Sequence, residues 1–247
     1  MQTEEAIRTP VGNPNFVYPV RHQPSGRAER EADMFDDRKD AGEKLGRALH
    51  KYKNKGVLVL GIPRGGVLVA YQVAKCLHGD LSLIVSRKLP FPDNPEAGFG
   101  AVAEDGSTFL FEDAETWLPQ VTIKRILREQ QKEAERRVAV LRKGRPLPPI
   151  GGRTVILVDD GIAMGSTMRA AIQTCKKQKA GKIVVGAPVA GPDVAKEIAR
   201  MVDELVVLEK PPFFRAVAQV YRYWYDVPDE EVIEILDRWE KEHSPAQ

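Results

Sequence analysis

Short, uninterrupted apolar runs recur along this chain, and most are followed by a segment in which apolar residues return at helical spacing. Strands buried on both faces of a parallel sheet read as uniform apolar runs, and strands that alternate with helices are typical of a doubly wound sheet. We therefore expect an α/β fold whose core is a doubly wound, mainly parallel, five-stranded sheet. The expected strands are residues 57–60, 81–85, 154–158, 183–185 and 205–208.

Proline spacing and turn signals indicate how the rest of the chain is organised. Four prolines without an apolar period predict an extended arm at the N-terminus, because proline fixes φ and lacks an N–H donor. Asp105-Gly106 is a strong signal for a hairpin turn, and three prolines predict a loop just before it. The expected parts are an arm (1–34), one domain (35–247), and, within the domain, a hairpin flap (89–120, with the loop at 89–97) and a hood or C-terminal segment (209–247).

Composition excludes several classes of protein. The 247 residues include 37 Lys and Arg against 35 Asp and Glu, so the net charge of +2 offers no basic excess for nucleic acid. No apolar run approaches the ~18 residues that span a membrane. The polar, acidic start is unlike a secretory signal, and two cysteines, Cys76 and Cys175, are too few for a disulfide framework. We expect a cytoplasmic protein with reduced thiols that binds neither nucleic acid nor membrane.

The small net charge conceals two opposed segments. Residues 120–145 hold nine basic residues against three Glu, which is 9 − 3 = +6. Residues 226–242 hold eight acids against two basic residues, which is 2 − 8 = −6. We expect these segments to face each other, either within the chain or across a dimer.

Chemically active residues gather where three expected strands end, at 61–66, 86–88 and 159–167. In a doubly wound sheet, ligands bind beyond the carboxyl ends of the strands. Asp159 and Asp160 repel each other, and their pairing makes sense if they hold hydroxyls or a hydrated Mg²⁺. The glycines and hydroxyls of 161–167 open a helix, whose N-terminus favours an anion. The set therefore suits a phosphorylated polyol.

Residues 155–167 closely resemble the phosphoribosyl-diphosphate (PRPP) binding motif of type I phosphoribosyltransferases. The resemblance implies that Asp159 and Asp160 hold the ribose hydroxyls, directly or through a water-coordinated Mg²⁺. It also implies a diphosphate-binding loop after the first core strand and a basic pair, Arg87-Lys88, that contacts diphosphate. The implied residues are Ala163, Met164, Gly165, Ser166 and Thr167 for the 5′-phosphate; Pro63, Arg64, Gly65, Gly66, Arg87 and Lys88 for diphosphate; and Asp159, Asp160, Arg87 and Lys88 for catalysis.

Two positions depart from the family pattern. Met164 stands where a threonine is usual, which removes one phosphate-binding hydroxyl that Ser166 can replace. Ala163 stands where hypoxanthine–guanine enzymes carry an acidic general base, which counts against a 6-oxopurine enzyme of that design. The resemblance extends over most of the chain, to a subgroup whose acceptor is unassigned.

The resemblance implies a Mg²⁺-dependent enzyme that transfers a 5-phosphoribosyl group from PRPP to a nitrogen acceptor, such as a nucleobase, and releases diphosphate. A homodimer is an expectation from the family alone. The role of Arg136 and Arg137 stays open, and of the six aromatics in residues 213–225 we expect one or two near the base.

Two other functions stay open. One is a PRPP-binding regulator without catalysis, which the short, proline-rich N-terminal segment and the retained Arg87-Lys88 disfavour. The other is a phosphotransfer receiver or phosphatase-like domain, in which the acidic pair would accept phosphate. The phosphate-cradling turn at 161–167 disfavours the latter, because a receiver needs no such turn after its acids.

Overall fold

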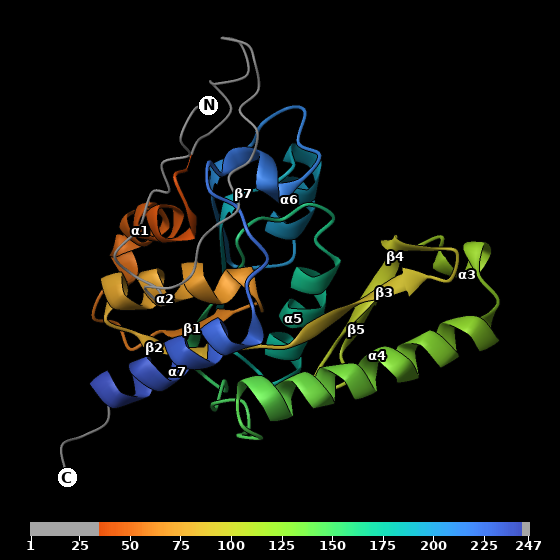
Figure 1. Cartoon of the computed structure of the whole chain (residues 1–247), viewed down its shortest axis with the longest axis horizontal. Helices are drawn as coiled ribbons and strands as arrows, with labels where there is room; N and C mark the ends of the chain where they lie inside the picture. The colour runs from red at the N-terminus through yellow and green to blue at the C-terminus, as the bar shows by residue number, and fades with distance from the viewer. Residues whose placement is uncertain (1–34, 244–247) are drawn as a thin grey trace, which may run out of the picture. The chain divides into compact units, whose positions relative to one another are not determined.

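A five-stranded parallel sheet lies at the centre of the computed structural model, which describes residues 35–243 (Figure 1). The strands run in the order β2-β1-β6-β7-β8, and every neighbouring pair is parallel. The doubly wound α/β fold predicted from the sequence is therefore confirmed. The strands are β1 (Leu58–Gly61), β2 (Asp80–Leu83), β6 (Thr154–Val158), β7 (Lys182–Val189) and β8 (Glu204–Glu209).

Helices cover both faces of this sheet, which is why its central strands β1 and β6 are almost entirely apolar. Val59 and Ile156 pack in one cluster with α1, α2 and α7, whereas their neighbours Leu60 and Leu157 pack in a second cluster with α5 and α6. Alternate residues thus enter two cores, as the two-residue period of a strand requires. The helices are α1 (Arg38–Ala48), α2 (Gly65–Leu77), α5 (Ser166–Lys177), α6 (Pro192–Ala199) and α7 (Asp229–His243).

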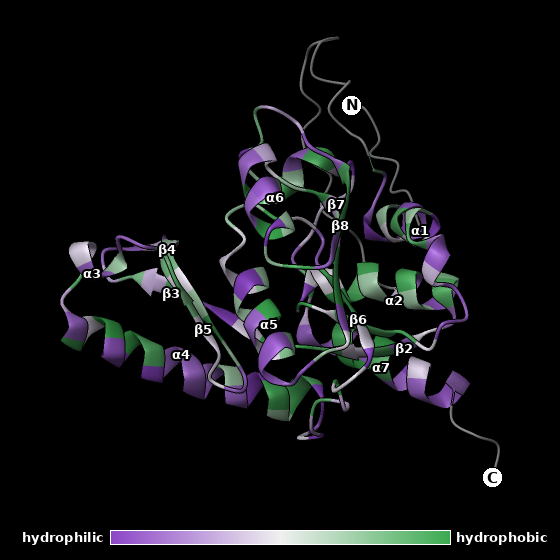
Figure 2. Cartoon of the chain, turned by 180° about the vertical axis from the view of Figure 1, so that it is seen from behind, coloured by the Kyte–Doolittle hydropathy of each residue, from purple (hydrophilic) through white to green (hydrophobic). Residues whose placement is uncertain are grey.

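A second, antiparallel sheet of three strands, β3-β4-β5, projects from the core and is backed by the long helix α4 (Gln120–Leu141) (Figure 1). Leu89, Phe99 and Val102 of this sheet pack against Ile123 and Ile126 of α4. In Figure 2 the helix is banded in hydrophilic and hydrophobic colours along its length, as its amphipathic pattern predicts. The strands are β3 (Ser86–Phe91), β4 (Asn94–Ala103) and β5 (Thr108–Leu110), and the short helix α3 (Ala114–Trp117) precedes α4.

The loop predicted at 89–97 is wrong in part, because β3 continues to Phe91 and β4 begins at Asn94. Pro90 is tolerated because β3 is an edge strand, and its pairing with β4 shifts register on both sides of this residue. Edge strands and bulges are the places in a sheet where proline costs no ladder hydrogen bond.

The strand predicted at 81–85 is also too long. The chain leaves the central sheet after Leu83 and enters the second sheet at Ser86, so Arg87 and Lys88 lie within β3 and not at the end of a core strand. Arg142, which is buried, donates to the Leu83 carbonyl and pairs with Glu104 at 2.5 Å. Glu104 in turn accepts from the Val85 N–H. A hydrophobic pattern could not reveal this switch, because the apolar run continues through Ile84 and Val85, past the end of β2.

Two smaller elements complete the described chain, η2 (His50–Tyr52) and η3 (Val217–Val220). The helical spacing of Phe35, Ala41, Leu45, Leu49 and Tyr52 predicts a first helix over 35–52, but α1 begins at Arg38, capped by Asp37, and ends at Ala48. Phe35 instead bridges Tyr221 near the C-terminal end. The predicted arm of residues 1–34 lies outside the described residues.

The two opposed charge segments do meet within the chain. Lys143 pairs with Asp237 at 2.7 Å, and Arg145 pairs with Glu240, so the end of the basic segment lies along α7. This confirms the first of the two arrangements expected from the charge count.

Both cysteines are free, as expected, and burial raises the pKa of Cys175 to about 12. Across residues 35–243 no helix is long and apolar enough to cross a membrane.

Candidate functional site

The loops after β1 and β6 touch each other at the carboxyl edge of the central sheet. Gly61 and Val158 are partners in the parallel register, and the Ile62 N–H donates to the Val158 carbonyl at 2.8 Å. A Cβ atom on Gly65 would lie 1.8 Å from Asp160 Oδ2, and one on Gly66 would lie 2.9 Å from Asp159 Oδ1. The glycines therefore let the first loop, in which the Pro63–Arg64 peptide bond is cis, rest directly on the acidic pair.

The two acids differ in their surroundings. Burial, and then the negative charge of Asp160, raise the pKa of Asp159 well above its ordinary value of 3.8. Asp160 has a cationic partner, because Arg38 Nε lies 2.8 Å from its Oδ2. The Asp160 N–H donates to Asp159 Oδ1 at 2.9 Å, which holds the Asp159 side chain against the backbone of the next residue. The carboxylate with a cationic partner thus lies next to one that resists ionisation.

Arg38 is a site residue that sequence reasoning missed. It is 4% exposed, donates from Nη1 to the Tyr225 carbonyl, and stacks on the Trp224 ring at 3.9 Å. Tyr221 Oη donates to the Asp160 carbonyl at 2.6 Å, so the C-terminal aromatic segment supports Asp160 from two directions. A signal was available, because Arg38 falls on the apolar stripe of its helix, three residues before Ala41. A charged residue on a buried stripe needs a partner.

The loop 161–167 ends in an open helix N-terminus. Gly165 has φ of +72°, which favours glycine, and α5 begins at the next residue without a side-chain cap. Within the described part of the chain, the backbone N–H groups of 163–168 donate to no protein acceptor. Ser166 is 7% exposed, whereas Ala163 and Met164 face solvent. This row of free donors is the arrangement that binds an anion.

A second buried arginine, also missed from the sequence, holds this loop in shape. Arg169 donates from Nη1 to the Met164 carbonyl at 2.7 Å and pairs with Glu197. Its guanidinium lies 4.9 Å from the ring centre of Phe109 on β5. Burial lowers the pKa of Arg169, and the charge of Glu197 opposes this. The loop 161–167 is therefore tied to the second sheet.

The basic residues predicted for diphosphate are divided between two directions. Arg64 lies in the first loop, 3.7 Å from Asp229, and Arg87 donates to Gln130 Oε1 of α4 at 3.4 Å. Lys88 instead donates to the Glu96 carbonyl at 2.5 Å, and its chain packs on Gly98. Successive side chains of a strand point to opposite faces of the sheet, so Arg87 and Lys88 cannot both point towards α4. The structure brings Arg64, Gly65, Gly66, Asp159 and Asp160 together, and leaves Lys88 directed along the hairpin.

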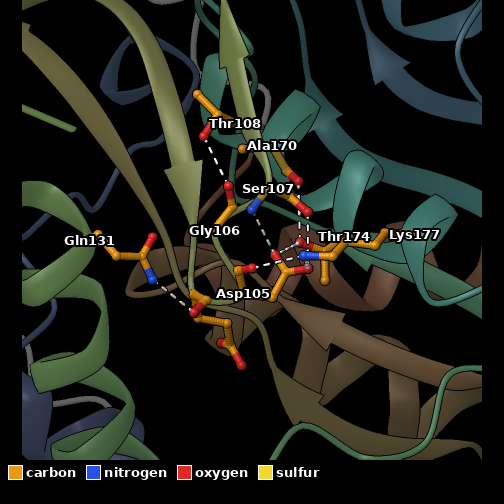
Figure 3. Close-up of polar contacts among 9 residues, drawn as sticks. Asp105, Gly106, Ser107, Thr108, Gln131, Ala170, Thr174 and Lys177 are labelled. Atoms are coloured by element: carbon orange, nitrogen blue, oxygen red, sulfur yellow. Dashed lines mark hydrogen bonds and ion pairs between the residues drawn. The ribbon is translucent and has the colours of Figure 1, made fainter. Parts of the chain in front are cut away.

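The turn of the β4–β5 hairpin is fastened to α5 (Figure 3). Asp105 accepts from Thr174 Oγ1 at 2.7 Å and from both the N–H and the hydroxyl of Ser107. Lys177 donates to the Asp105 carbonyl at 2.9 Å. Burial alone would raise the pKa of Asp105, but the hydrogen bonds from Thr174 and Ser107 hold that pKa below its ordinary value. The β4–β5 turn is therefore the fastened end of this sheet, and the β3–β4 turn at residues 92–94 is its exposed end.

The acidic pair can serve as part of a metal site but not as a whole one. The described residues contain no group of three or more His, Cys, Asp or Glu placed to hold a metal ion. Mg²⁺ usually keeps several waters and binds through one or two carboxylates plus substrate phosphates. Asp159 and Asp160 fit that second arrangement.

The acidic pair, the glycine loop resting on it and the open helix N-terminus, all at the edge of a doubly wound sheet, are the features of a phosphoribosyl transferase domain. The chain belongs to that family, whose domain matches residues 32–223. This confirms the resemblance seen in the sequence.

Individual relatives support the same grouping. Two proteins of Mycobacterium tuberculosis, each named "Putative phosphoribosyl transferase", are 41% identical to the chain over 215 residues. The match covers 86% of this chain and 48% of theirs, so the chain spans about half the length of these curated relatives. The crystal structure of TT1426 from Thermus thermophilus is 38% identical, with a TM-score of 0.71 over 83% of this chain and 98% of that one.

Proposed function

We propose that the protein transfers a 5-phosphoribosyl group from PRPP to a nitrogen acceptor of the nucleobase class and releases diphosphate. The observation that carries this proposal is the contact of Gly65 and Gly66 with Asp160 and Asp159. This contact joins the loop that carries Arg64 to the two acids, and the acids are followed directly by the loop 161–167 with its free N–H groups. These are the three partners that the diphosphate, the ribose and the 5′-phosphate of PRPP require.

Each part of the site has a role in the reaction. The free N–H groups of 163–168 bind the 5′-phosphate, and Asp159 and Asp160 accept hydrogen bonds from the ribose hydroxyls. The bond from the anomeric carbon to the diphosphate oxygen breaks, and its electron pair leaves with diphosphate. The acceptor nitrogen forms the new bond and loses its proton to water. Arg64 and Arg87 stabilise the charge that develops on the leaving group.

Mg²⁺ is part of this proposal. Asp159 and Asp160 would hold it through water, together with oxygens of the substrate. When bound, the ion neutralises negative charge on the diphosphate. Arg38 keeps Asp160 in place for that role, because its guanidinium already occupies the other side of the carboxylate.

The acceptor would meet the segment between β8 and η3. Val217 packs against Gly161, and Phe214 lies beside Gly191, so this segment borders the phosphate-binding loop. Phe213 is 88% exposed there and offers a free ring face. We propose that an aromatic acceptor stacks on Phe213, in keeping with the expectation that one or two aromatics lie near the base. Phe213→Ala would then raise the KM for the acceptor and leave the KM for PRPP unchanged.

The deciding experiment combines calorimetric titration of PRPP and Mg²⁺ with a diphosphate-release assay across purines, pyrimidines and small nitrogen acceptors. We expect binding and release with at least one acceptor, and loss of both in Asp159→Asn. Binding without release across the panel would support the alternative of a PRPP-binding regulator. Absence of PRPP binding would overturn both. A cytoplasmic role in nucleotide metabolism and a homodimer stay predictions.

A further inference from the structure

Four arginines from three parts of the fold surround two acids next to the first loop. Arg64 comes from the β1–α2 loop and Arg87 comes from β3. Glu133, Arg136 and Arg137 come from consecutive turns of α4. Asp229 opens α7, which lies beside the C-terminal half of α4 (Figure 1). We call this set the arginine ring; its members are Arg64, Arg87, Glu133, Arg136, Arg137 and Asp229.

The contacts of the arginine ring form two groups, one along α4 and one between the first loop and the start of α7. Glu133 accepts from Arg136 Nε at 2.7 Å and from Arg137 Nε at 3.1 Å. Arg64 lies 3.7 Å from Asp229. Gln130, one turn before Glu133 on the same face of α4, accepts from Arg87. Arg137 thus lies on the side of α4 that faces Arg87 and the first loop, which carries Arg64.

The charges of the ring do not balance. Four arginines against two carboxylates leave 4 − 2 = +2. No carboxylate among residues 35–243 forms an ion pair with Arg87, which is half-buried. Burial lowers the pKa of Arg87, and the neighbouring charge of Arg137 lowers it further. A network that served stability alone would pair its buried charges, because an unpaired one is costly.

The free Nη groups of Arg87 and Arg137 indicate what kind of ligand would complete the arginine ring. Arg87 and Arg137 each use only Nε for a protein hydrogen bond, so the described chain accepts nothing from their Nη groups. Arg137 is nonetheless only 19% exposed. Paired Nη donors match the oxygens of a phosphate group in a bidentate manner. A doubly charged anion bound between them would bring the ring to neutrality.

We propose that Arg137, held by Glu133, extends the diphosphate subsite and binds the outer phosphate of PRPP and of released diphosphate together with Arg87. This rests on the proposed function. Arg136 is 56% exposed and shares Glu133, so it acts mainly by holding that carboxylate in place. The α4 helix, which backs the hairpin sheet, thereby becomes part of the binding site.

The test measures the affinity of Arg137→Ala for inorganic diphosphate with Mg²⁺ and for ribose 5-phosphate, by calorimetry. Loss of a charge-assisted pair should weaken diphosphate binding about 10- to 100-fold and leave ribose 5-phosphate binding unchanged. Arg125→Ala is the matched control, because Arg125 pairs with Glu129 on the same helix at the same i,i+4 spacing and is 57% exposed.

The outcomes separate the two proposals. Equal diphosphate affinity in Arg137→Ala and Arg125→Ala would overturn the role of Arg137, while intact PRPP binding would leave the proposed function standing. A wild-type protein that binds neither PRPP nor ribose 5-phosphate would overturn the proposed function itself. Arg137→Lys keeps the charge without the bidentate fork, so it should recover part of the affinity if Arg137→Ala folds poorly.

Discussion

Arg38 Nε lies 2.8 Å from Asp160 Oδ2, and their side chains are only 4% and 13% exposed. The pair joins the first turn of the first helix to the end of β6, 122 residues later. Gly65 lies against the same two groups, since a Cβ there would approach Arg38 Nε to 2.7 Å. A buried ion pair therefore forms the junction of three segments at the site.

Removal of Arg38 tests this junction. Arg38→Ala leaves the Asp160 carboxylate buried without its partner, which should lower the free energy of unfolding by about 3–5 kcal/mol. Arg222→Ala is the control, because the Arg222–Asp36 pair is exposed on both sides and should contribute about 1 kcal/mol or less. Denaturant unfolding of both variants gives the comparison, and equal losses would show that Arg38 does not support Asp160.

Asp159→Asn should stabilise the protein while abolishing PRPP binding. The raised pKa of Asp159 means that the folded state holds a proton that the unfolded state releases above about pH 4. Stability of the wild type therefore falls as pH rises from the ordinary pKa towards the raised one. The advantage of the variant in Tm should grow over the same window, and a difference that is constant with pH would contradict the raised pKa.

Gly65→Ala should disrupt the site, because the added methyl group meets the buried Arg38–Asp160 pair. The added methyl group meets Asp160 Oδ2, so the loop or the carboxylate must move, and a shift of this size can cost about 100-fold in kcat/KM. Gly151→Ala is the matched control, since its Cβ would meet only the Gln178 carbonyl at an ordinary 3.5 Å. Activity retained in Gly65→Ala would show that the two loops need no contact.

Asp105→Ala should release the hairpin turn from α5. Thr174 is fully buried, and its hydroxyl would lose the acceptor on Asp105, which should cost about 1–3 kcal/mol. Amide hydrogen exchange of β5 should accelerate, whereas Lys196→Ala, in an exposed pair, should leave it unchanged. Because the pKa of Asp105 is lowered, its contribution to stability is present above about pH 4 and lost as pH falls below that.

The secondary structure was predictable wherever local pattern decides it. Residues 154–158 read as a strand and form β6 with the same bounds, because a uniformly apolar run between turn residues has few alternatives. The error at residues 84–91 arose because the apolar run continues through Ile84 and Val85 after the chain has left β2. The path there depends on Arg142 and Glu104, which are distant in sequence from Leu83.

Local sequence determined which residues carry the chemistry of the acidic pair and the glycine loop, because strand, turn and helix start are encoded within a few neighbouring residues. The tertiary structure alone decided how these parts are supported. The roles of Arg38, Arg169 and Arg137 follow from their partners in the folded chain, which are Asp160, the Met164 carbonyl and Glu133. The role of an arginine depends on which groups surround it after folding, and contacts such as those of Arg38 and Arg87 come from elements far apart in the chain.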